Sequence, residues 1–177
     1  MHNGKQTWHF SLYSVCLNQT AHHFHLQRRY RIHMETPLLL ILLCVAVTVT
    51  HCSLIDFGIM IHKVVQRSPL NYVLYGCHCG YGGRGQPMDN IDWCCHKHDC
   101  CFDYMVSIGC KPMNEPYKFT YIDGNLTCDS LQNNLCAQET CECDREATLC
   151  FKDHNDKYSQ TYRGYKKRWC TGQLPPC

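Results

Sequence analysis

The sequence lacks a strong net charge. Its 177 residues include 17 Lys and Arg and 15 Asp and Glu, for a formal net charge of +2. Four of the basic residues but only one acid, Glu35, precede Ser53, so the rest of the chain has 13 basic and 14 acidic residues. We therefore expect no strong field for nucleic acid or another polyanion.

Two common functional motifs are also missing. No Gly-x-Ser-x-Gly segment follows Ser53, so the strained serine of an acyl-enzyme mechanism is not expected. The glycine-rich stretch at residues 75–85 lacks the lysine of a phosphate-binding Walker loop. The sequence thus disfavours a serine esterase and a nucleotide-binding loop.

A long hydrophobic run is absent as well. The apolar stretch at residues 37–49 is shorter than the roughly 20 residues that span a bilayer, and it fits the core of a signal peptide better than a buried helix. Cleavage after Cys52 would leave Ser53 first, although Thr50 and Cys52 make an imperfect cleavage site. We expect an unstructured extension at 1–33, with Met34 as a start, then a signal peptide at 34–52 and one domain at 53–177.

Cysteine, in contrast, is abundant. Seventeen cysteines in so short a chain predict a disulfide scaffold in an oxidising, extracellular compartment. Fourteen of them follow Ser53, an even number, but sequence alone does not assign seven bonds.

One cysteine-rich stretch, residues 94–101, reads Cys-Cys-His-Lys-His-Asp-Cys-Cys. Apolar residues recur around it at helical spacing, and Asp89 can cap the helix. Cys94 and Cys101 are seven residues apart, about two turns or roughly 10.5 Å. A second pair, Cys143 and Cys150, has the same spacing, so two antiparallel helices could be joined twice.

That arrangement would place His98 between the two bonds and Asp144 beside one of them. A carboxylate facing an imidazole fixes the tautomer of a general base. His98 could instead be a buried structural histidine, or a zinc ligand together with His96 and nearby cysteines. Zinc is disfavoured because oxidised thiols do not bind it, and His96 is predicted to be a surface residue.

The glycine-rich stretch at 75–85 cannot form a stable helix or strand. Such a loop can turn successive carbonyl groups inward, as a hard cation requires, and Asp99 could add a carboxylate. The alternative is a merely flexible loop.

Three further elements are predicted. Apolar spacing indicates a first helix at 54–66 and a partner helix at 131–151. Asp123-Gly124 predicts a two-residue hairpin within 117–128, with a glycosylation sequon at Asn125 directly after it. The aromatic and basic tail at 157–169 fits a membrane-facing patch or a solvated segment equally well.

These motifs, Cys-Cys-x-x-His-Asp-Cys-Cys with Cys-x-Cys-Asp downstream and a C-terminal Pro-Pro-Cys, resemble the secreted phospholipase A2 family, group II. The resemblance covers residues 53–177. It implies a mainly α, disulfide-rich fold with two long antiparallel helices, an N-terminal helix, a calcium loop and a small β-hairpin. It also implies a secreted monomer that uses Ca²⁺ to hydrolyse the sn-2 ester of glycerophospholipids at a membrane surface.

The resemblance further implies individual roles. His98 would be the general base, Asp144 its partner and the Gly80 amide an oxyanion donor. The carbonyls of His78, Gly80 and Gly82 would join Asp99 around calcium, and Leu54, Phe57 and Ile61 would line an acyl channel. Tyr117 would support Asp144.

Three positions depart from the family pattern. Phe102 replaces a tyrosine that would bond Asp144, a loss worth about 1–3 kcal/mol if nothing replaces it. His78 replaces another tyrosine, and Asp56 replaces a glutamine. We expect the Phe102 change to reduce robustness without loss of chemistry, and the His78 change to be tolerated because the implied ligand there is a backbone carbonyl. The Asp56 change bears on the detail of interfacial binding.

The disulfides that the resemblance implies are Cys77–Cys170, Cys79–Cys95, Cys94–Cys150, Cys100–Cys177, Cys101–Cys143, Cys110–Cys136 and Cys128–Cys141. Two rival functions stay open at this point. The chain could be a catalytically weak relative that binds a cell-surface receptor, or a cysteine-rich structural module without an active site.

Overall fold

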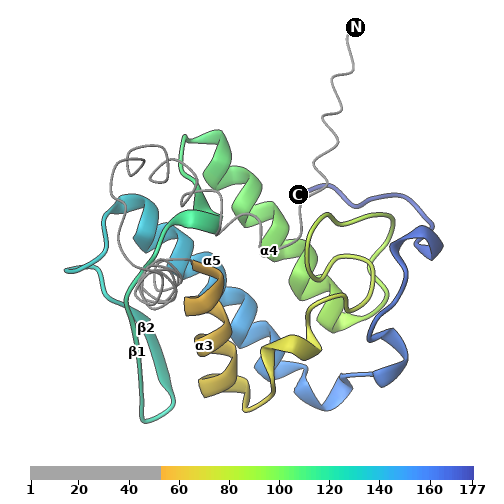
Figure 1. Cartoon of the computed structure of the whole chain (residues 1–177), viewed down its shortest axis with the longest axis horizontal. Coiled ribbons are helices and arrows are strands. Elements are labelled where there is room, and N and C mark those ends of the chain that lie inside the picture. The colour runs from red at the N-terminus through yellow and green to blue at the C-terminus, as the bar shows by residue number, and fades with distance from the viewer. Residues whose placement is uncertain (1–52) are drawn as a thin grey trace, which may run out of the picture. The chain divides into compact units, whose positions relative to one another are not determined.

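The computed structural model describes residues 53–177, which are coloured in Figure 1. The predicted extension at 1–33 and the predicted signal peptide at 34–52 lie outside these residues. Between residues 53 and 177, no helix is long and apolar enough to cross a membrane.

Three α-helices and one hairpin form the described part of the chain. The helices are α3 (Ser53–Val65), α4 (Asn90–Ser107) and α5 (Leu135–Asp153), and the strands are β1 (Phe119–Ile122) and β2 (Asn125–Cys128). Helices α4 and α5 lie side by side, and α3 packs against α5 (Figure 1). Five short 3-10 turns complete the list: Pro69–Asn71, Pro112–Asn114, Asn155–Lys157, Gln160–Tyr162 and Lys167–Trp169. The expected mainly α, disulfide-rich fold class is confirmed.

The start of each long helix is fixed by a capping side chain. The Asp89 carboxylate accepts a hydrogen bond from the Asp92 amide, as predicted for α4. The Asn134 side chain accepts one from the Ala137 amide at 2.9 Å, so α5 begins at Leu135. The prediction of a helix from residue 131 is therefore wrong by four residues, because residues 129–133 form a turn around the Asp129 carbonyl.

Helix α3 agrees with its prediction to within one residue at each end. It stops at Val65 because Gln66 adopts φ 58°, a left-handed conformation that ends a right-handed helix. The Ser53 hydroxyl donates to the Pro112 carbonyl at 2.5 Å and so holds the start of α3 against the 3-10 turn Pro112–Asn114.

Two disulfides join α4 to α5. Cys94–Cys150 and Cys101–Cys143 each have a Cα–Cα distance of 5.8 Å, so the two helices run antiparallel, and His98 lies between the bonds. The other five bonds are Cys77–Cys170, Cys79–Cys95, Cys100–Cys177, Cys110–Cys136 and Cys128–Cys141. These are the seven pairs that the resemblance implies.

The hairpin has the predicted two-residue turn. Ile122 pairs with Asn125, and Asp123 and Gly124 both adopt positive φ, at 50° and 81°. Positive φ at both central residues is the type I′ geometry whose twist matches that of paired strands. Asn125, the sequon asparagine, is exposed.

Replacing Asn134 by Ala is expected to lower the free energy of unfolding by about 1 kcal/mol, because the Ala137 amide loses its cap. Chemical denaturation with the disulfides intact measures the loss. Asn134→Ser keeps an oxygen at the cap and is expected to remain within a few tenths of a kcal/mol of the wild type. Equal losses in both variants would contradict this account of where α5 begins.

Candidate functional site

The centre of the site is a histidine and an aspartate on facing helices. His98 of α4 and Asp144 of α5 meet at 2.5 Å between Nε2 and Oδ1. The Tyr117 hydroxyl donates to the other carboxylate oxygen, Oδ2, also at 2.5 Å. Asp144 is 1% exposed and the His98 side chain 14%, so the carboxylate is buried while the ring reaches the surface.

This geometry determines which His98 nitrogen is free. Asp144 accepts from Tyr117 through one oxygen, so its second oxygen accepts from Nε2–H of His98. Nδ1 then carries the lone pair, and no group within residues 53–177 hydrogen bonds to it. A neutral imidazole oriented by a carboxylate is the arrangement of a general base.

Burial controls the electrostatics of the pair. It raises the pKa of Asp144, whereas the hydrogen bonds from His98 and Tyr117 favour the carboxylate and oppose that rise. Burial also raises the pKa of Tyr117, and the neighbouring Asp144 charge raises it further. Tyr117 therefore stays a neutral donor, as its bond to Asp144 requires.

Two phenylalanines hold the His98 ring. Phe57 of α3 stacks on it with centroids 4.8 Å apart, and Phe102 lies one helical turn away with centroids at 4.2 Å. Phe102 has no hydroxyl for Asp144, yet both carboxylate oxygens have partners within the described part of the chain. The change to phenylalanine therefore leaves no oxygen of Asp144 unpaired, because His98 bonds Oδ1 and Tyr117 bonds Oδ2.

The glycine-rich loop is tied down by a buried carboxylate that the sequence analysis missed. Asp92, which is 0% exposed, accepts hydrogen bonds from the amides of Cys77 and His78 at 2.7 Å and of Met88 at 2.8 Å. A Cβ on Gly76 would lie 2.4 Å from Asp92 Cγ, so glycine is required for this approach. The only sequence signal was an acid one residue after the apolar Ile91, on the buried face of α4.

Asp99 has the properties of a cation ligand. Its Oδ2 is buried and has no hydrogen-bond partner among the described residues. Burial raises the pKa of Asp99 to about 6, while nearby His98 and Lys167 oppose the rise. A buried carboxylate oxygen without a donor is costly unless a cation is near.

Two carbonyl groups of the loop accept hydrogen bonds from a positively charged side chain. The Lys167 ammonium donates to the carbonyls of Tyr81 at 2.8 Å and Gly82 at 2.6 Å. Oxygens that attract an ammonium, together with a buried carboxylate oxygen that no described residue pairs, are the kind of donors that a hard cation such as Ca²⁺ takes. The residues present therefore fit calcium.

Two buried histidines contact each other here, His78 within the loop and His96 on α4. His78 Nε2 lies 2.9 Å from the Gly85 carbonyl, and this contact explains how position 78 accepts a histidine. Burial lowers the pKa of His78. His96 is only 5% exposed, its Nε2 lies 3.1 Å from the Pro175 carbonyl, and its ring packs edge-on against His78. The prediction that His96 is a surface residue is therefore wrong, because the C-terminal segment covers it.

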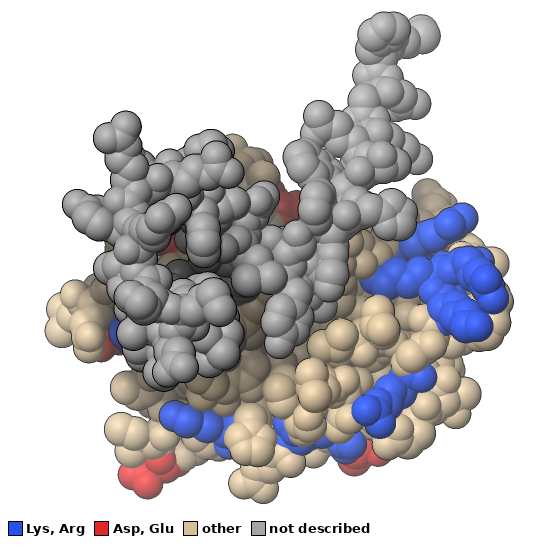
Figure 2. Space-filling view, in the orientation of Figure 1, with Lys and Arg blue, Asp and Glu red and all other residues tan. Residues whose placement is uncertain are grey.

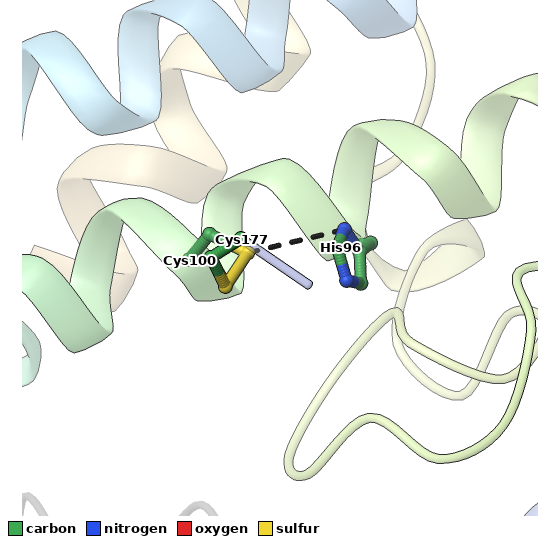
Figure 3. A group of neighbouring side chains, drawn as sticks. All are labelled: His96, Cys100 and Cys177. Atoms are coloured by element: carbon green, nitrogen blue, oxygen red, sulfur yellow. Dashed lines mark hydrogen bonds between the residues drawn. A yellow bond between two sulfur atoms is a disulfide. The ribbon is translucent and has the colours of Figure 1, made fainter. Parts of the chain in front are cut away.

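Figure 3 shows His96 beside the sulfurs of Cys100 and Cys177, a grouping whose ligand atoms are close enough for a metal. The two sulfurs are joined in a disulfide, and the Cys100 sulfur lies 3.9 Å from His96 Nδ1. Metal binding by cysteine needs a thiolate. This group is therefore structural, and zinc at His96 is not supported.

The predicted acyl-channel residues lie on α3. Leu54 and Phe57 are half-buried, and Ile61 is 3% exposed within the core that also contains Phe151. Phe57 reaches both His98 and Phe151. Asp56, on the same helix, accepts a hydrogen bond from the Tyr117 amide at 3.3 Å, which links it to the Asp144 network.

Comparison with known proteins gives a consistent result. A family profile described as phospholipase A2 matches residues 54–163. The chain is 41% identical to human group IIE secretory phospholipase A2 over 144 residues, which is 81% of this chain and all of that protein. It is 44% identical to mouse group IIF secretory phospholipase A2 over 74% of this chain and 78% of that protein. It is also 43% identical to a phospholipase A2 of Pithecopus azureus over 72% of this chain and 88% of that protein.

Replacing Asp92 by Asn should loosen the loop. An amide nitrogen in place of one oxygen meets backbone donors, so about 1–3 kcal/mol of unfolding free energy should be lost. Hydrogen exchange at the amides of Cys77, His78 and Met88 should rise together. Asp103→Asn, an exposed change on the same helix, is the control; unchanged exchange in the Asp92 variant would refute the role given to Asp92.

Tyr117→Phe should leave the Oδ2 atom of Asp144 buried without a donor, because Phe102 offers no second hydroxyl. We expect a loss of about 1–3 kcal/mol in unfolding free energy, measured by denaturation. Tyr121→Phe removes a hydroxyl that has no hydrogen-bond partner within the described part of the chain, so it should be close to neutral. Similar stability of the two variants would count against the Asp144 network.

Proposed function

The chain belongs to the phospholipase A2 family, and from this premise we propose that it is a secreted, calcium-dependent enzyme. It hydrolyses the sn-2 acyl ester of glycerophospholipids to a lysophospholipid and a free fatty acid. The observation that carries the proposal is the hydrogen bond between His98 Nε2 and Asp144, which leaves Nδ1 available as a base. Asp99, the proposed calcium ligand, is the next residue in the sequence.

In this proposal His98 Nδ1 accepts a proton from water as that water attacks the ester carbonyl. Asp144 holds the ring in place and stabilises the imidazolium that forms, and Tyr117 keeps Asp144 ionised. Phe57 and Phe102 restrict the tilt of the ring, so the lone pair keeps one direction.

Asp99 and the carbonyls of His78, Gly80 and Gly82 would hold Ca²⁺, and the Gly80 amide would donate to the developing oxyanion. When bound, calcium would act as a Lewis acid toward the phosphate and carbonyl oxygens of the substrate. Two observations support this set of ligands: no described residue pairs the Oδ2 atom of Asp99, and the Lys167 ammonium binds the Gly82 carbonyl.

The substrate is taken from a phospholipid membrane surface by a monomer. Leu54, Phe57 and Ile61 line the path of the acyl chain, which is supported by the contact of Phe57 with the His98 ring. The domain at 53–177 follows a signal peptide at 34–52 and an extension at 1–33.

A catalytically weak relative that binds a cell-surface receptor is the alternative. This alternative rests on three departures from the family pattern, at Asp56, His78 and Phe102. Each has a defined contact: Asp56 with the Tyr117 amide, His78 with the Gly85 carbonyl and Phe102 with the His98 ring. The three departures are thus accommodated around an intact His98–Asp144 pair, and for this reason we favour the enzyme.

Release of fatty acid from phospholipid vesicles tests the proposal. Activity should require calcium, vanish with a chelator and fall about 10²- to 10⁴-fold in His98→Gln, the contribution typical of a general base. His62→Gln, an exposed change on α3, should retain activity. Folded protein that binds calcium without releasing fatty acid would instead support the receptor-ligand alternative.

A further inference from the structure

The Lys167 ammonium stands out among the basic residues of the C-terminal segment. Its Nζ bonds two loop carbonyls, those of Tyr81 and Gly82, at 2.8 and 2.6 Å. Its neighbours behave differently: Lys166 and Arg168 are exposed and lie over the Trp169 ring at 5.3 and 5.7 Å. Figure 2 shows basic side chains gathered at the edge of the molecule where this segment runs.

The segment is fastened to the loop, so Lys167 stays within reach of these carbonyls. The disulfide Cys77–Cys170 joins the two directly. Backbone hydrogen bonds add two links: the Gln86 amide donates to the Thr171 carbonyl at 2.9 Å, and the Gly164 amide donates to the Leu74 carbonyl at 2.8 Å. A tethered group acts at a high effective concentration without any external ligand.

The Lys167 contact coincides with the proposed calcium ligands. Gly82 supplies one of the proposed carbonyls, and Asp99 is close enough to interact electrostatically with Lys167. An ammonium 2.6 Å from that oxygen and a divalent cation on the same oxygen repel each other strongly. The two positive charges therefore exclude one another from this loop.

We propose that Lys167 is an internal competitor for the calcium site: its ammonium occupies the loop carbonyls and must withdraw when calcium binds, so it lowers calcium affinity. The inference rests on the proposed function for the identity of the cation. Lys167 would thus set the calcium concentration at which the loop fills, while Lys166 and Arg168 would not.

Calcium binding measured by isothermal titration calorimetry tests the competition directly. Lys167→Met should bind calcium about tenfold more tightly than the wild type, a size common for coupled sites. Lys166→Met, the same change at the adjacent exposed position, should match the wild type. Lys167→Arg keeps the charge and should not reproduce the gain.

Lysine labelling with an acylating reagent, mapped by mass spectrometry, gives a second readout. Lys167 should be labelled slowly without calcium and faster with it, because the ammonium leaves the carbonyls, whereas Lys166 should be labelled equally in both conditions.

The outcomes separate the inference from the proposed function. Weaker calcium binding in Lys167→Met would mean that Lys167 supports the loop, and equal binding would mean that it does not compete; either result overturns the inference. Absence of calcium binding in every variant would instead overturn the calcium site itself, and the inference with it.

Discussion

The buried carboxylate of Asp144 is the interaction on which the rest of this structure depends. A charge in this position is stable only if its oxygens are fully paired, and here His98 pairs one and Tyr117 the other. The pairing has a directional consequence for His98, because it assigns the proton to Nε2 and leaves Nδ1 open. The pairing of the buried charge and the orientation of the His98 ring thus come from the same two hydrogen bonds.

The disulfides and two further carboxylates position this network. Cys94–Cys150 and Cys101–Cys143 hold α4 against α5 on either side of His98 and so help to keep His98 opposite Asp144. Asp92 accepts hydrogen bonds from the loop amides of Cys77 and His78, and Asp99 has a buried oxygen that no described residue pairs. The three aspartates therefore differ in their contacts: Asp92 binds loop amides, Asp144 pairs with His98 and Tyr117, and Asp99 keeps the buried oxygen proposed to bind a cation.

Much of this could be predicted from the sequence, for identifiable reasons. The equal spacing of two cysteine pairs indicated both the antiparallel helices and the meeting of His98 with Asp144, since helical geometry converts sequence separation into distance. Asp123-Gly124 specified its turn because few residues adopt positive φ easily. These signals are local, or become local once two helices are paired.

What could not be predicted depends on contacts between distant segments. The burial of His96 has no local signal, because nothing near it in sequence reveals that Pro175 covers it. Lys167 looks like its basic neighbours in sequence, and only the path of the tail over the loop distinguishes it. The start of α5 was misplaced because the apolar pattern continues through a turn that Asn134 ends.

A crystal structure determined in millimolar calcium is the most direct test of the central claim, that Asp99, the glycine loop and His98 form one reaction centre. We expect one cation bound by the Asp99 carboxylate and the carbonyls of His78, Gly80 and Gly82 at about 2.3–2.6 Å, with His98 Nδ1 facing the same space. A cation bound elsewhere, or His98 turned away from Asp144 when the loop is filled, would contradict it.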